Sequence, residues 1–126
     1  MNDNFNEKLN LDELYERSRE TSQTKVKTYQ KILARIHTRI KTISRQRNNT
    51  TFCMYIIPEF ILGIPRYDIT ECTNYVISKL TENGFQIKYT YPNLLFISWQ
   101  HYIPKYQRSE IKKKTGVIID GFGNVV

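Results

Sequence analysis

The segment from Leu11 to Gln46 contains neither glycine nor proline. These two residues most often end or break a helix. A stretch of this length without them therefore predicts one long helix. Within it, apolar residues recur at alternating spacings of three and four, which is typical of one face of an amphipathic helix. This stripe consists of Val26, Tyr29, Leu33, Ile36, Ile40 and Ile43.

The stripe allows two interpretations. The helix could lie with this face on its own domain, or two copies of the chain could associate through it. The heptad-like pattern from Val26 to Ile43 is shorter than the three to four heptads typical of a coiled coil. Before Val26 the pattern fades, because Arg19 and Ser22 occupy its positions. We therefore expect residues 1–20 to be an acidic, flexible N-terminus.

Positive charge is concentrated in one part of the chain, whose net charge is +7. Residues 1–20 carry −3, residues 21–47 carry +8 with no acid, residues 48–104 carry −1 and residues 105–126 carry +3. Such blocks usually face a polyanion or an acidic partner. The candidate polyanion-binding residues are Lys25, Lys27, Lys31, Arg35, Arg39, Lys41, Arg45, Arg47, Lys112, Lys113 and Lys114.

Four of these bases, Lys27, Lys31, Arg35 and Arg39, follow one another at i+4 spacing. Each step rises about 6 Å along a helix, a spacing similar to that of phosphates along a nucleic-acid strand. Contact with several phosphates would give binding that does not depend on sequence and weakens with salt. The alternatives are an acidic protein partner, a solvated face, or pairing with the chain's own acidic residues 1–20.

The middle of the chain reads as strand, helix and hairpin. Residues 51–57 are β-rich and almost wholly apolar, which predicts a strand buried on both faces. Asp68 with Glu71 has the form of a capping box at the start of a second helix, and Gly84 marks its end. Residues 86–91 and 94–99 are β-rich runs around Pro92-Asn93, which predicts a hairpin.

These elements predict an α+β fold. A long basic N-terminal helix (21–47) precedes a β-α-β-β core (51–104) with a three-stranded mixed sheet, and a basic tail (105–126) follows. We expect the second helix to cover one face of the sheet and the long helix or a partner to cover the other. The final run, residues 117–126, could form a short hairpin or add to the edge of a sheet.

Little in the sequence favours catalysis or cofactor binding. The metal-type ligands His37, Cys53, Cys72 and His101 lack the spacing of a metal site, and no nucleophile, phosphate loop or carboxylate pair is marked. We therefore predict no catalytic residue, no metal and no cofactor. No apolar run is long enough for membrane insertion, and the polar, acidic N-terminus predicts no signal peptide.

The chain resembles a small uncharacterised protein family of the nucleocytoplasmic large DNA viruses, with mimivirus-like and phycodnavirus-like members. The resemblance lies over about residues 25–126 and leaves the acidic N-terminus outside. The residues that carry it are Pro58-Glu59-Phe60, Gly63 to Asp68, Tyr75 to Phe85, Tyr91 to Trp99, Glu110 to Gly116 and Asp120 to Asn124. It implies a virus-encoded accessory or virion component made in the host cytoplasm, and no catalytic residues.

Together these features predict a non-enzymatic viral accessory or virion assembly protein that contacts viral structural or assembly proteins. We expect it to form a homo-oligomer through the Val26–Ile43 stripe, in the viral factory of the host cytoplasm and in the virion. The alternative is a nucleic-acid-binding protein of genome packaging or viral transcription, with the basic helix and tail on phosphates.

Overall fold

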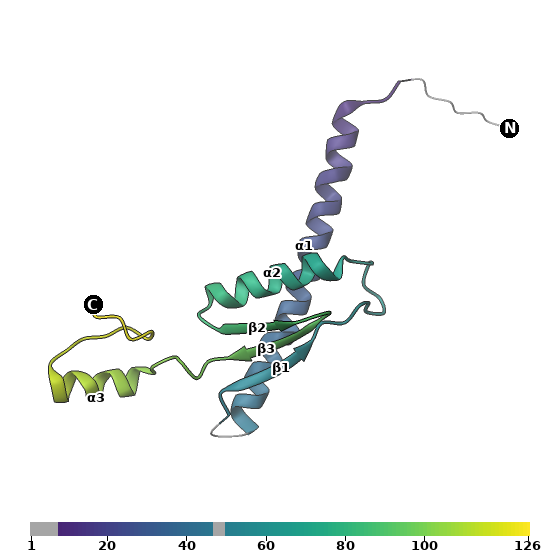
Figure 1. The fold of residues 1–126 in the computed structure, drawn as a ribbon. Helices are drawn as coiled ribbons and strands as arrows, with labels where there is room; N and C mark the ends of the chain where they lie inside the picture. The colour runs from purple at the N-terminus through teal and green to yellow at the C-terminus, as the bar shows by residue number, and fades with distance from the viewer. Residues whose placement is uncertain (1–7, 47–49) are drawn as a thin grey trace.

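The computed structural model describes residues 8–46 and 50–126 (Figure 1). The described part is an α+β fold with a long helix, a three-stranded sheet and a second helix, as the sequence predicts, and a third helix lies near the C-terminus. Its elements are α1 (Leu11–Gln46), β1 (Phe52–Ile56), α2 (Ile69–Glu82), β2 (Gln86–Thr90), β3 (Leu94–Ser98) and α3 (Lys105–Thr115).

The sheet has the strand order β1-β3-β2, and both neighbouring pairs are antiparallel. The prediction of a mixed sheet is therefore wrong. After β2 the chain turns at Pro92-Asn93 and returns as β3 between the other two strands. The parallel strands β1 and β2 are thus separated, and β1 is left as an edge strand.

Helices α1 and α2 cover the same face of the sheet and also contact each other. The expectation that they, or a partner, would divide the two faces is wrong. Their buried side chains meet those of the strands in one core. That core consists of Tyr29, Ile32, Ile36, Ile40, Cys53, Ile57, Tyr67, Cys72, Val76, Leu80, Leu95 and Ile97.

Strand β1 is buried on one face only, which corrects the prediction of a strand buried on both. Cys53 points into the core, whereas Phe52, Met54 and Ile56 alternate with the inward residues and are exposed. An apolar strand looks the same in sequence whether one of its faces is covered or both are. Here both helices lie on one side, so the other side of β1 remains open.

Helix α1 runs without a break from Leu11 to Gln46, so its first ten residues are not a separate flexible segment. The predicted boundary near residue 20 is not a boundary of secondary structure, and residues 1–7 lie outside the described residues. The stripe fades before Val26 because the helix has left the body there. Burial begins at Thr28, and every residue from 8 to 27 is exposed.

Helix α2 begins at the Asp68 cap that the sequence predicts, but the predicted capping box is only half present, because the Glu71 carboxylate bonds to Tyr29 of α1. The Asp68 side chain accepts hydrogen bonds from the backbone N–H groups of Thr70 (2.8 Å) and Glu71 (3.3 Å). Such a cap satisfies donors that have no partner within the helix. The helix ends at Asn83-Gly84, where the φ angle of Gly84 is +96°.

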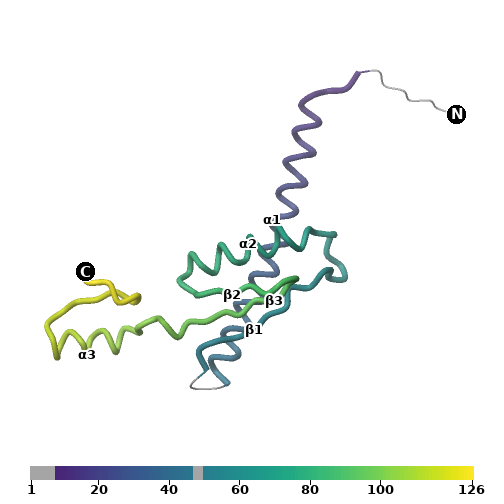
Figure 2. Tube along the Cα trace, viewed as in Figure 1, coloured from purple at the N-terminus to yellow at the C-terminus, as the bar shows by residue number. Residues whose placement is uncertain are grey.

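The tail contains a helix, α3, that the sequence analysis did not predict. This helix has no buried residue, so no apolar stripe in the sequence indicates it. It ends at Gly116, whose φ angle is +75°. An antiparallel bridge between Ile119 and Val125 confirms the short hairpin. Figure 2 shows that α3 and this tail lie at the opposite side of the molecule from the N-terminal end of α1.

In the described residues, no helix combines the length and the apolar character needed to cross a membrane.

Candidate functional site

The predicted self-association stripe lies mainly against the chain's own core. Tyr29, Ile36 and Ile40 are buried, and Leu33 and Ile43 are partly buried against the same core. Only Val26 remains open, at 41% exposure. A second copy could reach the three buried side chains only if α1 left the sheet. The first interpretation of the stripe, a helix lying on its own domain, therefore describes this part of α1.

Ile32 does not belong to the predicted stripe, yet it is fully buried at the centre of this helix face. A strict repeat of 3.5 residues selects Leu33 for the stripe, whereas an α-helix has 3.6 residues per turn. In α1, Ile32 is fully buried and Leu33 is only partly buried against the same core.

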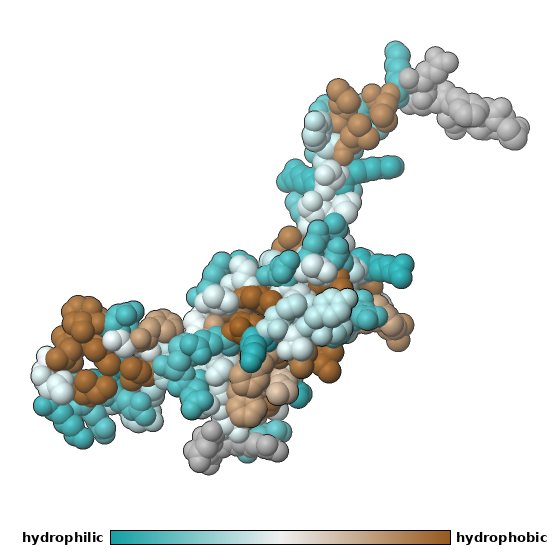
Figure 3. Space-filling model, in the orientation of Figure 1, coloured by the Kyte–Doolittle hydropathy of each residue, from teal (hydrophilic) through white to brown (hydrophobic). Residues whose placement is uncertain are grey.

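The N-terminal part of α1, residues 11–27, projects beyond the body of the protein, and we call it the arm (Figure 1). It carries large apolar side chains that face solvent, among them Leu11 (68% exposed), Leu14 and Tyr15 (76%). Figure 3 shows an apolar patch at this end of the helix. Leu11, Tyr15, Ser18, Ser22 and Val26 continue the buried stripe toward the N-terminus at spacings of three and four.

Charge is unevenly distributed along the arm. Residues 11–18 carry three acids and one base, and residues 19–27 carry three bases and one acid, so the two halves have net charges of −2 and +2. Because α1 is continuous, the acids of residues 11–20 cannot fold back onto the basic half of the same helix. The predicted pairing of these two segments within one chain is therefore excluded for residues 11–46.

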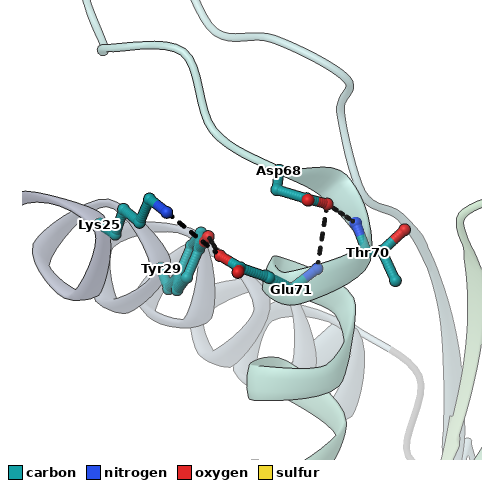
Figure 4. Close-up of polar contacts among 5 residues, drawn as sticks. All are labelled: Lys25, Tyr29, Asp68, Thr70 and Glu71. Atoms are coloured by element: carbon teal, nitrogen blue, oxygen red, sulfur yellow. Dashed lines mark hydrogen bonds and ion pairs between the residues drawn. The ribbon is translucent and has the colours of Figure 1, made fainter. Parts of the chain in front are cut away.

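The base of the arm is held to α2 by one polar cluster (Figure 4). The Tyr29 hydroxyl donates a hydrogen bond of 2.9 Å to Glu71 Oε2, and Lys25 Nζ lies 3.8 Å from the same oxygen. Burial and the hydrogen bond to Glu71 both raise the pKa of Tyr29, so its hydroxyl remains a donor. Glu71 therefore bonds across to α1 and links the base of the arm to α2.

The predicted polyanion-binding residues do not form one surface. All the basic side chains of α1 within the described range are exposed, as are Lys112, Lys113 and Lys114. The three lysines belong to the last turn of α3, which does not contact α1 in the described part of the chain and lies apart from it in Figure 2. Arg47 lies outside the described residues. The helix and the tail would thus contact a polyanion separately.

Two of the α1 arginines border a groove of about 660 Å³ between α1 and β1. On the helix side its lining includes Arg35, Thr38, Arg39, Thr42 and Ile43, and on the strand side Phe52, Cys53, Met54 and Tyr55. Arg39 Nε donates a 3.2 Å hydrogen bond to the backbone carbonyl of Met54. No sequence signal could have revealed this groove, because it arises from the placement of a helix beside an edge strand.

The outer face of the sheet is apolar over β1 and most of β3 and polar over β2, and no element of the described chain covers it. Phe52, Met54 and Ile56 of β1 and Leu94 and Phe96 of β3 share this face. The rings of Phe52 and Phe96 stack with centroids 5.4 Å apart. In Figure 3 apolar surface appears over the strands as well as at the end of α1.

The structure does not bring together the histidines and cysteines for which the sequence predicts no metal site. Cys53 and Cys72 are buried in the core, where burial raises the pKa of both thiols, to about 11 for Cys72. A ring nitrogen of His101, Nε2, lies 2.8 Å from the Gly84 carbonyl, and His37 is half-buried on α1. Across residues 8–46 and 50–126, no three side chains of His, Cys, Asp or Glu gather in a metal-binding arrangement.

Residues 9–81 match the model of a family of unknown function, DUF5759. An uncharacterised protein of Acanthamoeba polyphaga mimivirus is 38% identical to the chain over 96 residues, which is 73% of this chain and 76% of that protein. No solved structure matches the chain. The family match includes the arm, which the sequence-based resemblance had left outside, and it ends before the hairpin.

Proposed function

This chain belongs to DUF5759, a family of unknown function with a mimivirus relative, and from that premise we propose that it is a non-enzymatic viral assembly protein. It acts through protein–protein contacts, including contacts with a second copy of itself. Its other partners are viral structural or assembly proteins, its setting is the viral factory of the host cytoplasm, and it enters the virion. We also propose that the family has members in phycodnavirus-like genomes.

The exposed arm is the main observation that supports this proposal. Most of the stability of helices in proteins comes from packing of an apolar face. Residues 11–27 are helical and exposed, with leucines and a tyrosine facing solvent. A second helix packed along Leu11, Tyr15 and Val26 would supply the missing contact.

The partner of the arm is the arm of a second copy, in antiparallel orientation. In that orientation the acidic half of each arm (11–18) lies beside the basic half of the other (19–27), whereas a parallel pair would place like charges side by side. Ser18 and Ser22 occupy the middle of the stripe and allow the two helices to approach closely. The arrangement is two-fold symmetric, as in most homodimers.

Sedimentation velocity over a range of concentrations tests this dimer. The double substitution Leu11→Glu/Tyr15→Glu should raise the dimer dissociation constant at least about tenfold, because it places charge in the apolar contact. Phe60→Glu/Leu62→Glu is the matched control, since these side chains are also highly exposed but lie in the loop before α2. A monomer at every concentration for the unaltered chain, or equal dimers in both variants, would contradict the proposal.

Charge reversal tests the orientation. Glu13→Lys/Glu16→Lys should weaken the dimer, and adding Arg19→Glu/Lys27→Glu to the same chain should restore it, because opposite charges again face each other. A combined variant that remains as weak as the first would show that the arms do not pair in this way.

Nucleic-acid binding is the second candidate, favoured by the exposure of the basic side chains along α1. If they bind phosphates, affinity for a short mixed-sequence duplex should fall steeply between about 50 and 200 mM salt. Reversing Lys27 and Lys31 together should then weaken binding by about tenfold or more. Unchanged affinity in fluorescence anisotropy after this reversal would remove the candidate for this face of the helix.

A further inference from the structure

Strand β1 presents an open hydrogen-bonding edge. In the antiparallel pairing with β3, the N–H of Ile57 donates to Asn93 and the N–H of Trp99 donates to Thr51. Backbone groups alternate in direction along a strand, so those of residues 52, 54 and 56 point away from β3. An exposed edge of this kind is a template for pairing with another strand.

The open edge borders the groove between α1 and β1. Its volume of about 660 Å³ lies between helix residues such as Thr38 and Thr42 and strand residues such as Met54. Such a groove, with an edge strand on one side and a helix on the other, can hold an extended chain. Main-chain hydrogen bonds then supply affinity, and alternate side chains supply specificity.

The electrostatics of the groove favour a negatively charged occupant. Arg35 and Arg39 line it, and no acidic side chain appears among the described residues around it. The only bond across it that the described chain forms is the one from Arg39 Nε to the Met54 carbonyl. An incoming backbone N–H can take over that carbonyl and release the guanidinium to bind a carboxylate.

We propose that this groove binds an extended acidic segment of another protein, which adds to β1 as a fourth antiparallel strand. Side chains of the bound segment alternate between the two faces of the enlarged sheet. Those on the helix side are acidic and pair with Arg35 and Arg39. Those on the other side are apolar and extend the uncovered face formed by Phe52, Met54 and Ile56. This surface is separate from the arm, and the proposal does not depend on self-association.

The probe is a fluorescein-labelled peptide of eight residues in which glutamate and valine alternate, titrated with the full chain and followed by fluorescence anisotropy. A peptide in which lysine replaces glutamate is the charge comparison, and it should bind at least about tenfold more weakly. Salt should weaken the binding of the acidic peptide, because carboxylates and guanidinium groups meet at an exposed site.

Two kinds of variant separate strand addition from attraction by charge alone. Met54→Pro removes an N–H that points to the open edge and blocks the approach of a strand, but it removes no bond within the sheet. Arg35→Glu/Arg39→Glu reverses the charge of the groove, and Lys27→Glu/Lys31→Glu makes the same change elsewhere on α1. The first two should each lower the affinity by about tenfold or more, and the third by less than about threefold.

Thr38→Glu is a further test of the charge of the groove that leaves the edge of β1 unchanged. It places a carboxylate in the groove from an exposed helix position, so it should also weaken binding of the acidic peptide. Circular dichroism confirms that each variant keeps the fold. The proposal is overturned if the glutamate–valine peptide does not bind at millimolar concentration, or if both charge-reversed variants lose affinity equally. It is also overturned if Met54→Pro and Thr38→Glu leave the affinity unchanged, or if a single-stranded oligonucleotide occupies the groove in preference to the peptide.

Discussion

Replacing Ile36 with alanine is expected to lower the free energy of unfolding by about 2 to 5 kcal/mol. The Ile36 side chain is fully buried where α1 meets the rest of the core. Alanine would remove three carbon atoms there and leave a cavity whose walls cannot fully collapse. The total stability of a small domain is about 5 to 15 kcal/mol, so this one truncation would remove a large part of it.

Chemical denaturation followed by circular dichroism measures this loss as a shift of the midpoint without a change of slope. Val26→Ala is the control, because Val26 belongs to the same stripe but is 41% exposed, and it should cost less than about 1 kcal/mol. Equal losses in the two variants would show that the sheet does not cover α1 as described.

The second large effect is a loss of stability at alkaline pH. Burial raises the pKa of the Cys72 thiol from 9.0 to about 11. Below pH 9 the thiol is neutral in both the folded and the unfolded chain, so its full contribution is present. As the pH rises through this range, the unfolded chain loses the proton and the folded chain keeps it. The free energy of unfolding therefore falls with pH, and the loss approaches about 2.7 kcal/mol only above pH 11.

Other buried groups also lower the free energy of unfolding as the pH rises. The pKa values of Cys53, Tyr29, Tyr55 and Tyr67 are also raised, in each case with burial as the largest cause. Urea unfolding at several pH values between 7 and 10.5 should thus show a decreasing midpoint above pH 9. Cys72→Ala, which carries no thiol, should show a shallower decrease. A midpoint that stays constant across this range would contradict the burial of these groups.

The local elements of this fold could be predicted where single residues determine them. The lack of glycine and proline permits a long α1 but does not set its ends, because the first such residue in the chain is Pro58. By contrast, Asp68 caps α2 and Gly84 ends it. The Pro92-Asn93 turn likewise marks the hairpin. Each of these signals acts through the backbone of a few neighbouring residues, so it does not depend on the rest of the chain.

Features that depend on the arrangement of elements could not be predicted in this way. The strand order depends on β3 returning between β1 and β2, and no residue of β1 encodes that insertion. The apolar residues Phe52, Met54 and Ile56 are the same in sequence whether a helix covers them or not. Helix α3 was missed because its stability does not come from a buried stripe.

The candidate site was located only in part by the sequence. The stripe was recognised, but its buried and open parts could not be separated without knowing where α1 leaves the body near Thr28. The basic residues were recognised as well, but sequence gives no distance between Arg39 and Met54. The groove and the open edge are properties of packing, and they became visible only with the position of α1 beside β1.

The unbroken course of α1 gives the protein a rigid spacer. A helix rises 1.5 Å and turns about 100° per residue, so whatever binds near Leu11 is held at a set distance and bearing from the sheet. Inserting four residues before Thr28 would move that attachment outward by about 6 Å and rotate it by about 40°. Inserting seven would move it by about 10.5 Å with a rotation of only about 20°. The distance of the attachment from the sheet and its direction around the helix axis are therefore coupled. Only insertions close to a whole number of turns, such as about seven or eleven residues, change the distance while nearly preserving the direction.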